Sequence, residues 1–132
     1  MDREKKATLV AILEIVTALG LAGFWMLFFT VGLAPENPPA CFFAYEHSFP
    51  LADLVLAGTL IAAGILTLKR HPGARTVTHA CAGALVFLGL LDFSFNMQNG
   101  IYALSVESML SNGFINLWCV GFGLAAALLT LD

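Results

Sequence analysis

The sequence is poor in charged residues, and this shortage sets the class of protein. Aspartate, glutamate, lysine and arginine together make up 11% of its 132 residues, whereas a soluble domain contains about 25%. Hydrophobic residues make up 59% of the chain and occur in long blocks. Each block must therefore be compared with the roughly 20 residues that a helix needs to cross a bilayer.

Other absences narrow the function. The sequence has no Cys-x-x-Cys pair, no glycine-rich phosphate loop and no nucleophile elbow, which argues against redox disulfide, nucleotide and serine-hydrolase chemistry. Its three cysteines and three histidines do not stand at the spacing of metal ligands, so we expect no metal and no cofactor. The net charge of −3 excludes nucleic acid as a partner. An enzyme is disfavoured but not excluded.

Four apolar segments are each long enough to span a membrane. Backbone in hydrocarbon must satisfy its own hydrogen bonds, and continuous apolar runs without two-residue alternation favour helices over a barrel. The first run has 27 residues, whereas the apolar core of a removable signal peptide has about 7–15, so we expect it to stay uncleaved. We predict one all-α integral membrane domain, residues 1–132, whose four transmembrane helices form an up-down antiparallel bundle. The helices are expected at about 7–33, 49–68, 76–95 and 112–131.

The basic residues predict how the chain lies in the membrane. All of them lie before the first segment or between the second and third, and none lies in the other two connections. Because basic loops stay in the cytoplasm, both termini are expected there and residues 34–48 and 97–111 on the outer side. We expect a multi-pass protein of a prokaryotic plasma membrane, surrounded by lipids, alone, as a homodimer or within a larger membrane complex. The basic residues are Arg3, Lys5, Lys6, Lys69, Arg70 and Arg75.

The first outer connection carries turn and capping signals. Three prolines in "APENPPA", 34–40, are expected to end the first helix and keep the chain extended. Ser48 is a candidate N-cap for the second helix, and Pro50 suits its first turn, where a missing N–H costs little.

The second outer connection, 97–111, has two interpretations. In one, Gly100 makes a turn and the fourth helix starts early. In the other, residues 101–110 form a short interfacial helix with Tyr102 at headgroup depth. We prefer the second interpretation.

Small residues at close spacing suggest where the helices approach each other, because small faces let membrane helices pack closely. A short turn between the second and third helices should make these two antiparallel neighbours. The candidate contact residues are Gly58, Ala62, Ala80, Ala84, Gly121, Gly123 and 125–127.

Three helices carry polar residues at one depth. Asp53 lies four residues into the second helix from the outer side, Asp92 about three residues before the outer end of the third, and Asn116 four residues into the fourth. At about 1.5 Å per residue, all three lie roughly 5–6 Å inside the outer helix ends. Asn96 lies one turn from Asp92 on the same face. A charge at the bilayer centre costs roughly 2.5–3.5 kcal/mol on insertion scales. We therefore expect polar residues in such a layer to have a structural partner or a function.

Two interpretations compete for this layer. In one, Asp53, Asp92, Asn96 and Asn116 line an outward-facing pocket for a ligand with a cation or a hydrogen-bond donor, and aromatic side chains pack on its apolar body. In the other, the same groups cap helix ends and bond across helices. The candidate aromatic residues are Phe42, Phe43, Tyr45, Phe95 and Trp118.

Glu46 and His47 come just before the second helix. We expect them on the outer side of the same polar layer, at the opening of the pocket. His47 is the only residue there that could supply a positive charge. It is either a pH-responsive or acid/base group, or a solvated loop residue.

Glu14 stands apart from this layer, about two turns into the first helix from the cytoplasmic side. Thr17, Leu21 and Trp25 share its helical face. The stretch "AILEIVTALG", 11–20, resembles the first helix of the small multidrug resistance transporters, which carry a membrane-embedded glutamate there. The resemblance implies that Glu14 binds a proton or a cation. The alternative is that it pairs with His79 or a hydroxyl such as Thr78.

Three hypotheses follow. The first is a small protein that binds or transports a lipophilic or cationic ligand, with Asp53, Asp92, Asn96, Asn116, Glu46, His47 and Trp118 at the site and Glu14 coupling protons. The second is an accessory subunit of a larger membrane complex. The third is an intramembrane acid/base enzyme such as an isomerase, which would need Glu46, His47 and Asp92 within hydrogen-bond reach.

Overall fold

Long apolar runs with few interruptions produce four long helices. The computed structural model describes residues 1–131 and contains α1 (Arg3–Thr30), α3 (Pro50–Leu68), α4 (Ala74–Gln98) and α5 (Val106–Leu129). A short helix α2 (Phe42–Glu46) precedes α3, and a 3₁₀ turn η1 (Ile101–Ala103) precedes α5. Within residues 1–131, four stretches are long and apolar enough to cross a membrane, one of them formed by α2 and α3 together. The predicted all-α architecture with four candidate membrane spans is confirmed.

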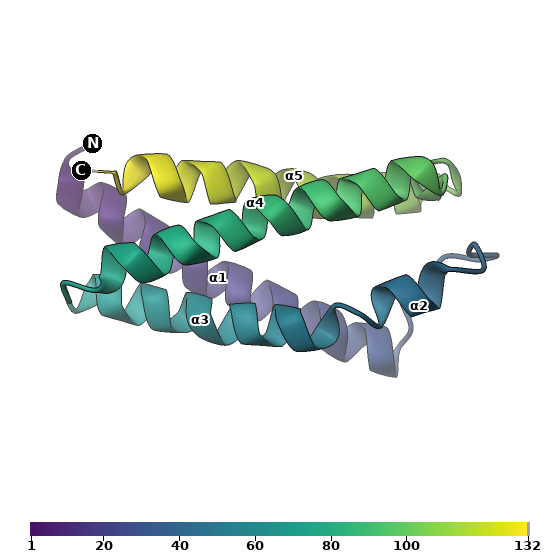
Figure 1. Ribbon diagram of the computed structural model, residues 1–132, viewed down its shortest axis with the longest axis horizontal. Helices are drawn as coiled ribbons and strands as arrows, with labels where there is room; N and C mark the ends of the chain where they lie inside the picture. The colour runs from purple at the N-terminus through teal and green to yellow at the C-terminus, as the bar shows by residue number, and fades with distance from the viewer. Residues whose placement is uncertain (132) are drawn as a thin grey trace.

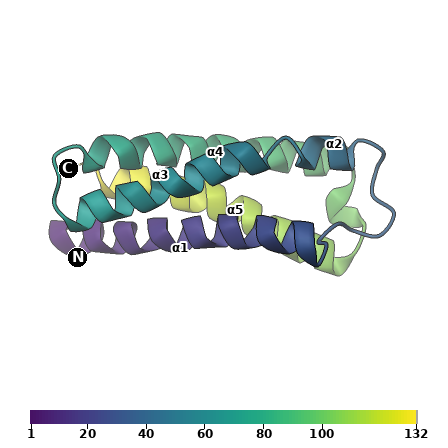
Figure 2. The same ribbon diagram turned by 90° about the horizontal axis from the view of Figure 1, so that it is seen from below.

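The four long helices form two pairs. α1 packs mainly against α3, α4 packs mainly against α5, and contacts between α3 and α4 join the pairs. Successive long helices run in opposite directions, as predicted. Figure 1 shows that the two pairs lie close together at the end of the molecule that holds both termini and separate toward the other end. The bundle is therefore a wedge, and in both views α2 lies at its wide end (Figure 2).

The ends of α1 are set by side chains and a glycine rather than by the prolines. Its N-cap is Asp2, whose carboxylate accepts the Lys5 backbone N–H at 2.9 Å. The helix ends at Thr30, and Gly32 follows with a φ of +86°, a conformation that glycine adopts without strain. The predicted end at residue 33 is therefore three residues too late.

The start of α3 differs from the prediction in one respect. Pro50 does occupy the first turn of the helix. The N-cap position belongs to Phe49, however, and makes no side-chain cap bond. The Ser48 hydroxyl instead donates to the Ala44 carbonyl at 3.0 Å, within the turn that follows α2. The predicted Ser48 cap is wrong because Ser48 donates instead to a carbonyl of the short helix α2, which was not predicted from the sequence.

The preferred interpretation of 97–111 is also wrong. Residues 101–110 do not form a separate helix. Gly100 turns the chain with a φ of +67°, and α5 starts early at Val106. The cause is an N-cap at Ser105, whose hydroxyl accepts the Ser108 backbone N–H at 2.9 Å and so satisfies a donor of the first turn.

Three glycines provide the closest helix contacts. A Cβ atom on Gly64 would lie 2.9 Å from the Ala11 carbonyl of α1, and one on Gly123 would lie 2.8 Å from the Ala82 carbonyl of α4. One on Gly89 would lie 2.7 Å from Val120 of α5. Most of the small residues that suggested close packing face outward and do not make these contacts. Gly58, Ala62, Ala80, Ala84 and Gly121 are exposed.

Candidate functional site

A cavity of about 350 Å³ lies inside the wide half of the bundle. This size is at the lower end of the roughly 300–1,000 Å³ of small-molecule pockets. Its lining residues come from α1, α2, α3, α4 and α5, and Phe49 lines it at the junction of α2 and α3. The walls are mainly apolar or aromatic and include Val16, Leu21, Phe24, Trp25, Leu88, Phe114, Ile115 and Trp118.

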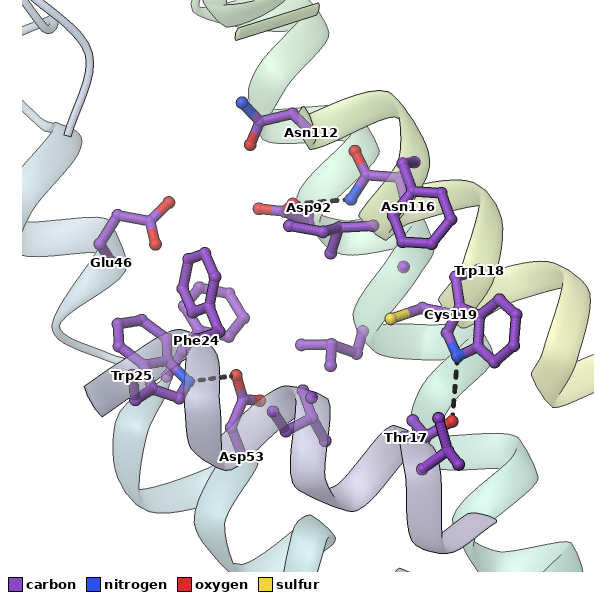
Figure 3. Close-up of a pocket in the computed structure, with 18 residues that line it drawn as sticks. Thr17, Phe24, Trp25, Glu46, Asp53, Asp92, Asn112, Asn116, Trp118 and Cys119 are labelled. Atoms are coloured by element: carbon purple, nitrogen blue, oxygen red, sulfur yellow. Dashed lines mark hydrogen bonds between the residues drawn. The ribbon is translucent and has the colours of Figure 1, made fainter. Parts of the chain in front are cut away.

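Three carboxylates reach this cavity from different sides. Glu46 projects from α2, Asp53 from α3 and Asp92 from α4 (Figure 3). None of the 18 lining residues is basic. Among residues 1–131, no three His, Cys, Asp or Glu side chains are grouped closely enough to hold a metal ion. The carboxylates are therefore spread around the cavity wall rather than gathered about one point.

Asp53 is held by a single side-chain donor. The Trp25 indole N–H donates to Asp53 Oδ2 at 2.8 Å, which links α1 to α3. Asp53 is only 6% exposed, and its other oxygen has no hydrogen bond within the described residues. Figure 3 shows this carboxylate at the edge of the cavity with Trp25 beside it. Asp53 therefore keeps an acceptor that a ligand could use.

Asp92 has more partners and ties three helices together. Its Oδ1 accepts the Tyr45 hydroxyl of α2 at 3.0 Å, and its Oδ2 accepts the side-chain amides of Asn116 at 2.6 Å and Asn96 at 3.2 Å. The Asn96 amide also lies 3.1 Å from the Asn116 carbonyl oxygen, which it contacts as a donor. Three convergent donors favour an acceptor at this position.

Tyr102 completes this network from η1. Its hydroxyl donates to the Asn116 carbonyl oxygen. Burial raises the pKa of the Tyr102 hydroxyl above its ordinary value, so the group remains protonated, and remains a donor, at neutral pH. The turn after α4 is thereby attached to α5.

The structure brings together most, but not all, of the residues that the sequence suggested. Asp53, Asp92, Asn116, Glu46 and Trp118 line the cavity. Asn96 is buried behind the lining, at 1% exposure, and acts through its bonds to Asp92 and Asn116.

His47 lies outside the cavity. Its ring is exposed and packs against Phe29 and Phe28, with ring centroids 5.8 Å and 6.1 Å apart. No hydrogen bond within the described residues joins it to Glu46 or Asp92. The three groups that acid/base chemistry would need do not converge in this structure.

Glu14 lies in the narrow half of the bundle, away from the cavity lining. It is 1% exposed, and neither carboxylate oxygen has a hydrogen-bond partner among residues 1–131. The expected pairing with His79 is not formed, because His79 Nε2 lies 3.0 Å from the Thr130 hydroxyl and 3.3 Å from the Ala127 carbonyl. No hydrogen bond of normal geometry joins Glu14 to Thr78 either.

The contribution of α1 to the cavity was not predicted from the sequence. Thr17, Leu21 and Trp25 line the cavity, although their shared helical face was recognised only in connection with Glu14. Helical rise could have placed Trp25 correctly. It lies five residues before the end of α1, roughly 7–8 Å inside, which is close to the depth of Asp53.

Comparison with models of protein families, with characterised proteins and with solved structures gives no match to this chain. The resemblance of residues 11–20 to the small multidrug resistance transporters therefore has no support beyond that stretch.

Proposed function

We propose that this chain is a multi-pass membrane protein whose cavity binds a small lipophilic ligand that carries an ammonium group or a similar hydrogen-bond donor. The observation that carries the proposal is an apolar cavity in which three carboxylates, Glu46, Asp53 and Asp92, project from three helices with no basic residue in the lining. Charges inside a membrane bundle are costly and usually pair with a partner or a ligand.

Asp53 is the best candidate for the direct contact, because it is the one buried carboxylate of the three at the cavity, whereas Glu46 and Asp92 are partly exposed. Asp92 already accepts three hydrogen bonds, whereas Asp53 accepts one. An ammonium group can donate three hydrogen bonds and accept none, which matches a site that offers acceptors. Trp25, Phe24 and Trp118 provide aromatic faces in the same cavity, and such faces attract cations and pack well against apolar chains.

Binding alone and transport differ in their need for Glu14. Its unpartnered carboxyl in the narrow half of the bundle supports a role as the proton-binding group of a transport cycle. In liposomes, transport predicts that a pH gradient drives amine uptake faster than into protein-free liposomes for the wild type but not for Glu14→Gln. Binding alone predicts the protein-free rate of uptake for both.

The proposal is tested by the melting temperature of the purified protein in detergent, with dodecylamine as the probe and dodecanoate as its oppositely charged control. Dodecylamine should raise the melting temperature by several degrees, because a ligand that binds only the folded state stabilises it. Asp53→Asn should weaken binding at least about tenfold, since loss of a desolvated charge contact costs more than about 1.4 kcal/mol.

The matched control is Glu107→Gln, which removes an exposed carboxylate outside the cavity lining. Its response to dodecylamine should equal that of the wild type. Equal stabilisation of the wild type and Asp53→Asn, or equal effects of dodecylamine and dodecanoate, would contradict the proposal.

A further inference from the structure

We infer that the ligand is a single-chain amphiphile already dissolved in the membrane, and that it reaches the cavity sideways through a gap between α1 and α5. This inference rests on the proposed function of the cavity. It adds the source of the ligand, its shape and the path by which it arrives.

The gap follows from how the helices pair. α1 packs against α3 and α5 packs against α4, but contacts between α1 and α5 are sparse. Figure 1 shows these two helices separating toward the wide end of the bundle. Among residues 1–131, the one hydrogen bond between them joins the Trp118 indole N–H to the Thr17 hydroxyl at 2.9 Å. This bond closes the gap on the side of the termini, and the gap remains open from there toward the wide end of the bundle.

The residues at the edges of the gap both line the cavity and face outward. Val16 of α1 is 50% exposed and Phe114 of α5 is 65% exposed. Gly20 of α1 also lines the cavity, is also exposed and presents no side chain to block the opening. It lies ten residues before the end of α1, roughly 15 Å along the helix axis, which is about half of a hydrocarbon layer of roughly 30 Å. The opening therefore meets lipid tails rather than headgroups.

The wide end of the bundle is covered more fully than this side. Tyr45 of α2 stacks on Phe95 of α4, with ring centroids 3.5 Å apart and planes 6° apart, and it donates to Asp92 at 3.0 Å. These contacts tie α2 to α4 above the cavity, where Phe49 adds to the lining. A ligand from water would have to pass these contacts, whereas a ligand from the lipid would pass Gly20, which has no side chain.

The distribution of charge selects the occupant. The mouth of the gap is apolar, formed by Val16, Gly20 and Phe114, whereas the inner wall carries Asp53 and Asp92. An amphiphile with an ammonium head can place that head at Asp53 while its chain remains between α1 and α5. An anionic lipid would meet carboxylates with no cation to offset its charge, which is unfavourable in a site of low dielectric constant.

The two tryptophans report on the cavity directly, because Trp25 and Trp118 both line it and the chain has only these two. The experiment uses phosphatidylcholine vesicles that contain hexadecylamine with a nitroxide on its chain, and it measures quenching of tryptophan fluorescence. Hexadecanoate with the same nitroxide gives the background from unbound lipid. The amine should quench the wild type at a mole fraction at least about tenfold lower than the acid does.

The test of the path is Gly20→Phe, with Gly20→Leu as a second variant. A Cβ atom at Gly20 meets nothing within 4 Å, so a side chain there should fold without strain and fill the mouth. The matched control is Gly83→Phe on α4, which is equally exposed and open but outside the lining. After labelled amine is added to the vesicles, both Gly20 variants should be quenched at least about tenfold more slowly than the wild type, because a filled mouth slows entry, and Gly83→Phe should match the wild type.

Different failures have different meanings. If Asp53→Asn weakens quenching but Gly20→Phe is quenched as fast as the wild type, the ligand binds and the lateral path is wrong. If butylamine in the aqueous phase displaces the probe from Gly20→Phe as readily as from the wild type, a path from water replaces the lateral one. If light scattering shows that Gly20→Phe converts a dimer to a monomer, a second copy covers the gap and the inference is overturned. Equal quenching by the wild type and Asp53→Asn overturns the proposed function itself.

Discussion

At the scale of single residues, carboxylates in one small bundle have very different surroundings. Asp92 accepts three hydrogen bonds from α2, α4 and α5 and is part of what holds the wide end together. Asp53 accepts one, from Trp25, and Glu14 accepts none within the described residues. Satisfied groups are structural by default, whereas buried groups with spare acceptors are available for function. The assignment of Asp53 to the ligand rests on this difference.

The unpartnered state of Glu14 leads to a prediction about stability. Replacing a buried polar group that has no partner with an apolar group of similar shape removes a desolvation cost of about 1–3 kcal/mol. Glu14→Met should therefore raise the free energy of unfolding by up to that amount, measured by denaturant titration in mixed micelles. Glu14→Gln, which remains polar, should show no such gain. Destabilisation by Glu14→Met would mean that Glu14 has a partner essential to the fold.

The sequence could predict which polar residues share a depth but not which of them touch. Helical rise placed Asp53, Asp92 and Asn116 in one layer, and all three line the cavity. It could not show that Asn96 lies behind the lining or that His47 packs on Phe28 and Phe29 outside it. Those outcomes depend on the rotation of each helix about its axis, which is set by packing between helices and is not encoded in local hydropathy.

At the scale of helices, the sequence predicted where the four membrane spans lie better than it predicted the residues at which the helices begin and end. Apolar length alone located four spans, because the bilayer imposes that length. The ends depended on single residues: Gly32 after α1, the Ser105 cap of α5 and Pro50 in the first turn of α3. The Ser105 cap was visible in the sequence, whereas the early stop of α1 was hidden by three nearby prolines that offered a competing signal.

Contacts between helices lead to a second prediction about stability. A methyl group at Gly123 would lie 2.8 Å from both the Ala82 carbonyl oxygen and Val86 Cγ2, so Gly123→Ala should force α4 and α5 apart. Overpacking of this kind typically costs about 1–3 kcal/mol.

Gly121 is the matched control, because a Cβ atom there meets nothing within 4 Å. Gly121→Ala should be neutral or stabilise the protein by up to about 1 kcal/mol through helix propensity. Thermal unfolding of both variants under the same conditions provides the comparison. Equal effects of the two substitutions would show that α4 and α5 do not approach at Gly123.

At the scale of the whole molecule, charge is distributed unevenly between the two ends of the bundle. The turn between α3 and α4 lies at the same end as both termini (Figure 1), and Arg70 in this turn forms an ion pair with Glu4. All six basic residues lie at this end of the bundle, within residues 3–6 and 69–75. If basic segments stay in the cytoplasm, the wide end and its cavity face the opposite side.

The cysteines allow this orientation to be measured without engineering a reporter. Cys41 is exposed before α2, whereas Cys81 and Cys119 are buried within the bundle. A membrane-impermeant maleimide added to intact cells should therefore label the wild type and should not label Cys41→Ser. Labelling that appears only after the cells are lysed would place the wide end in the cytoplasm and reverse the predicted orientation.

The wedge shape, in which two helix pairs close at one end and separate at the other, places the cavity in the wide half of the bundle, and the proposed ligand would reach it from lipid. The most direct test is native mass spectrometry of the protein purified from its native membrane. We predict that the wild type carries a small amphiphile and that Asp53→Asn, purified in parallel, does not. A wild-type chain that carries no small molecule and is found in fixed stoichiometry with a second protein would contradict the account and identify an accessory subunit instead.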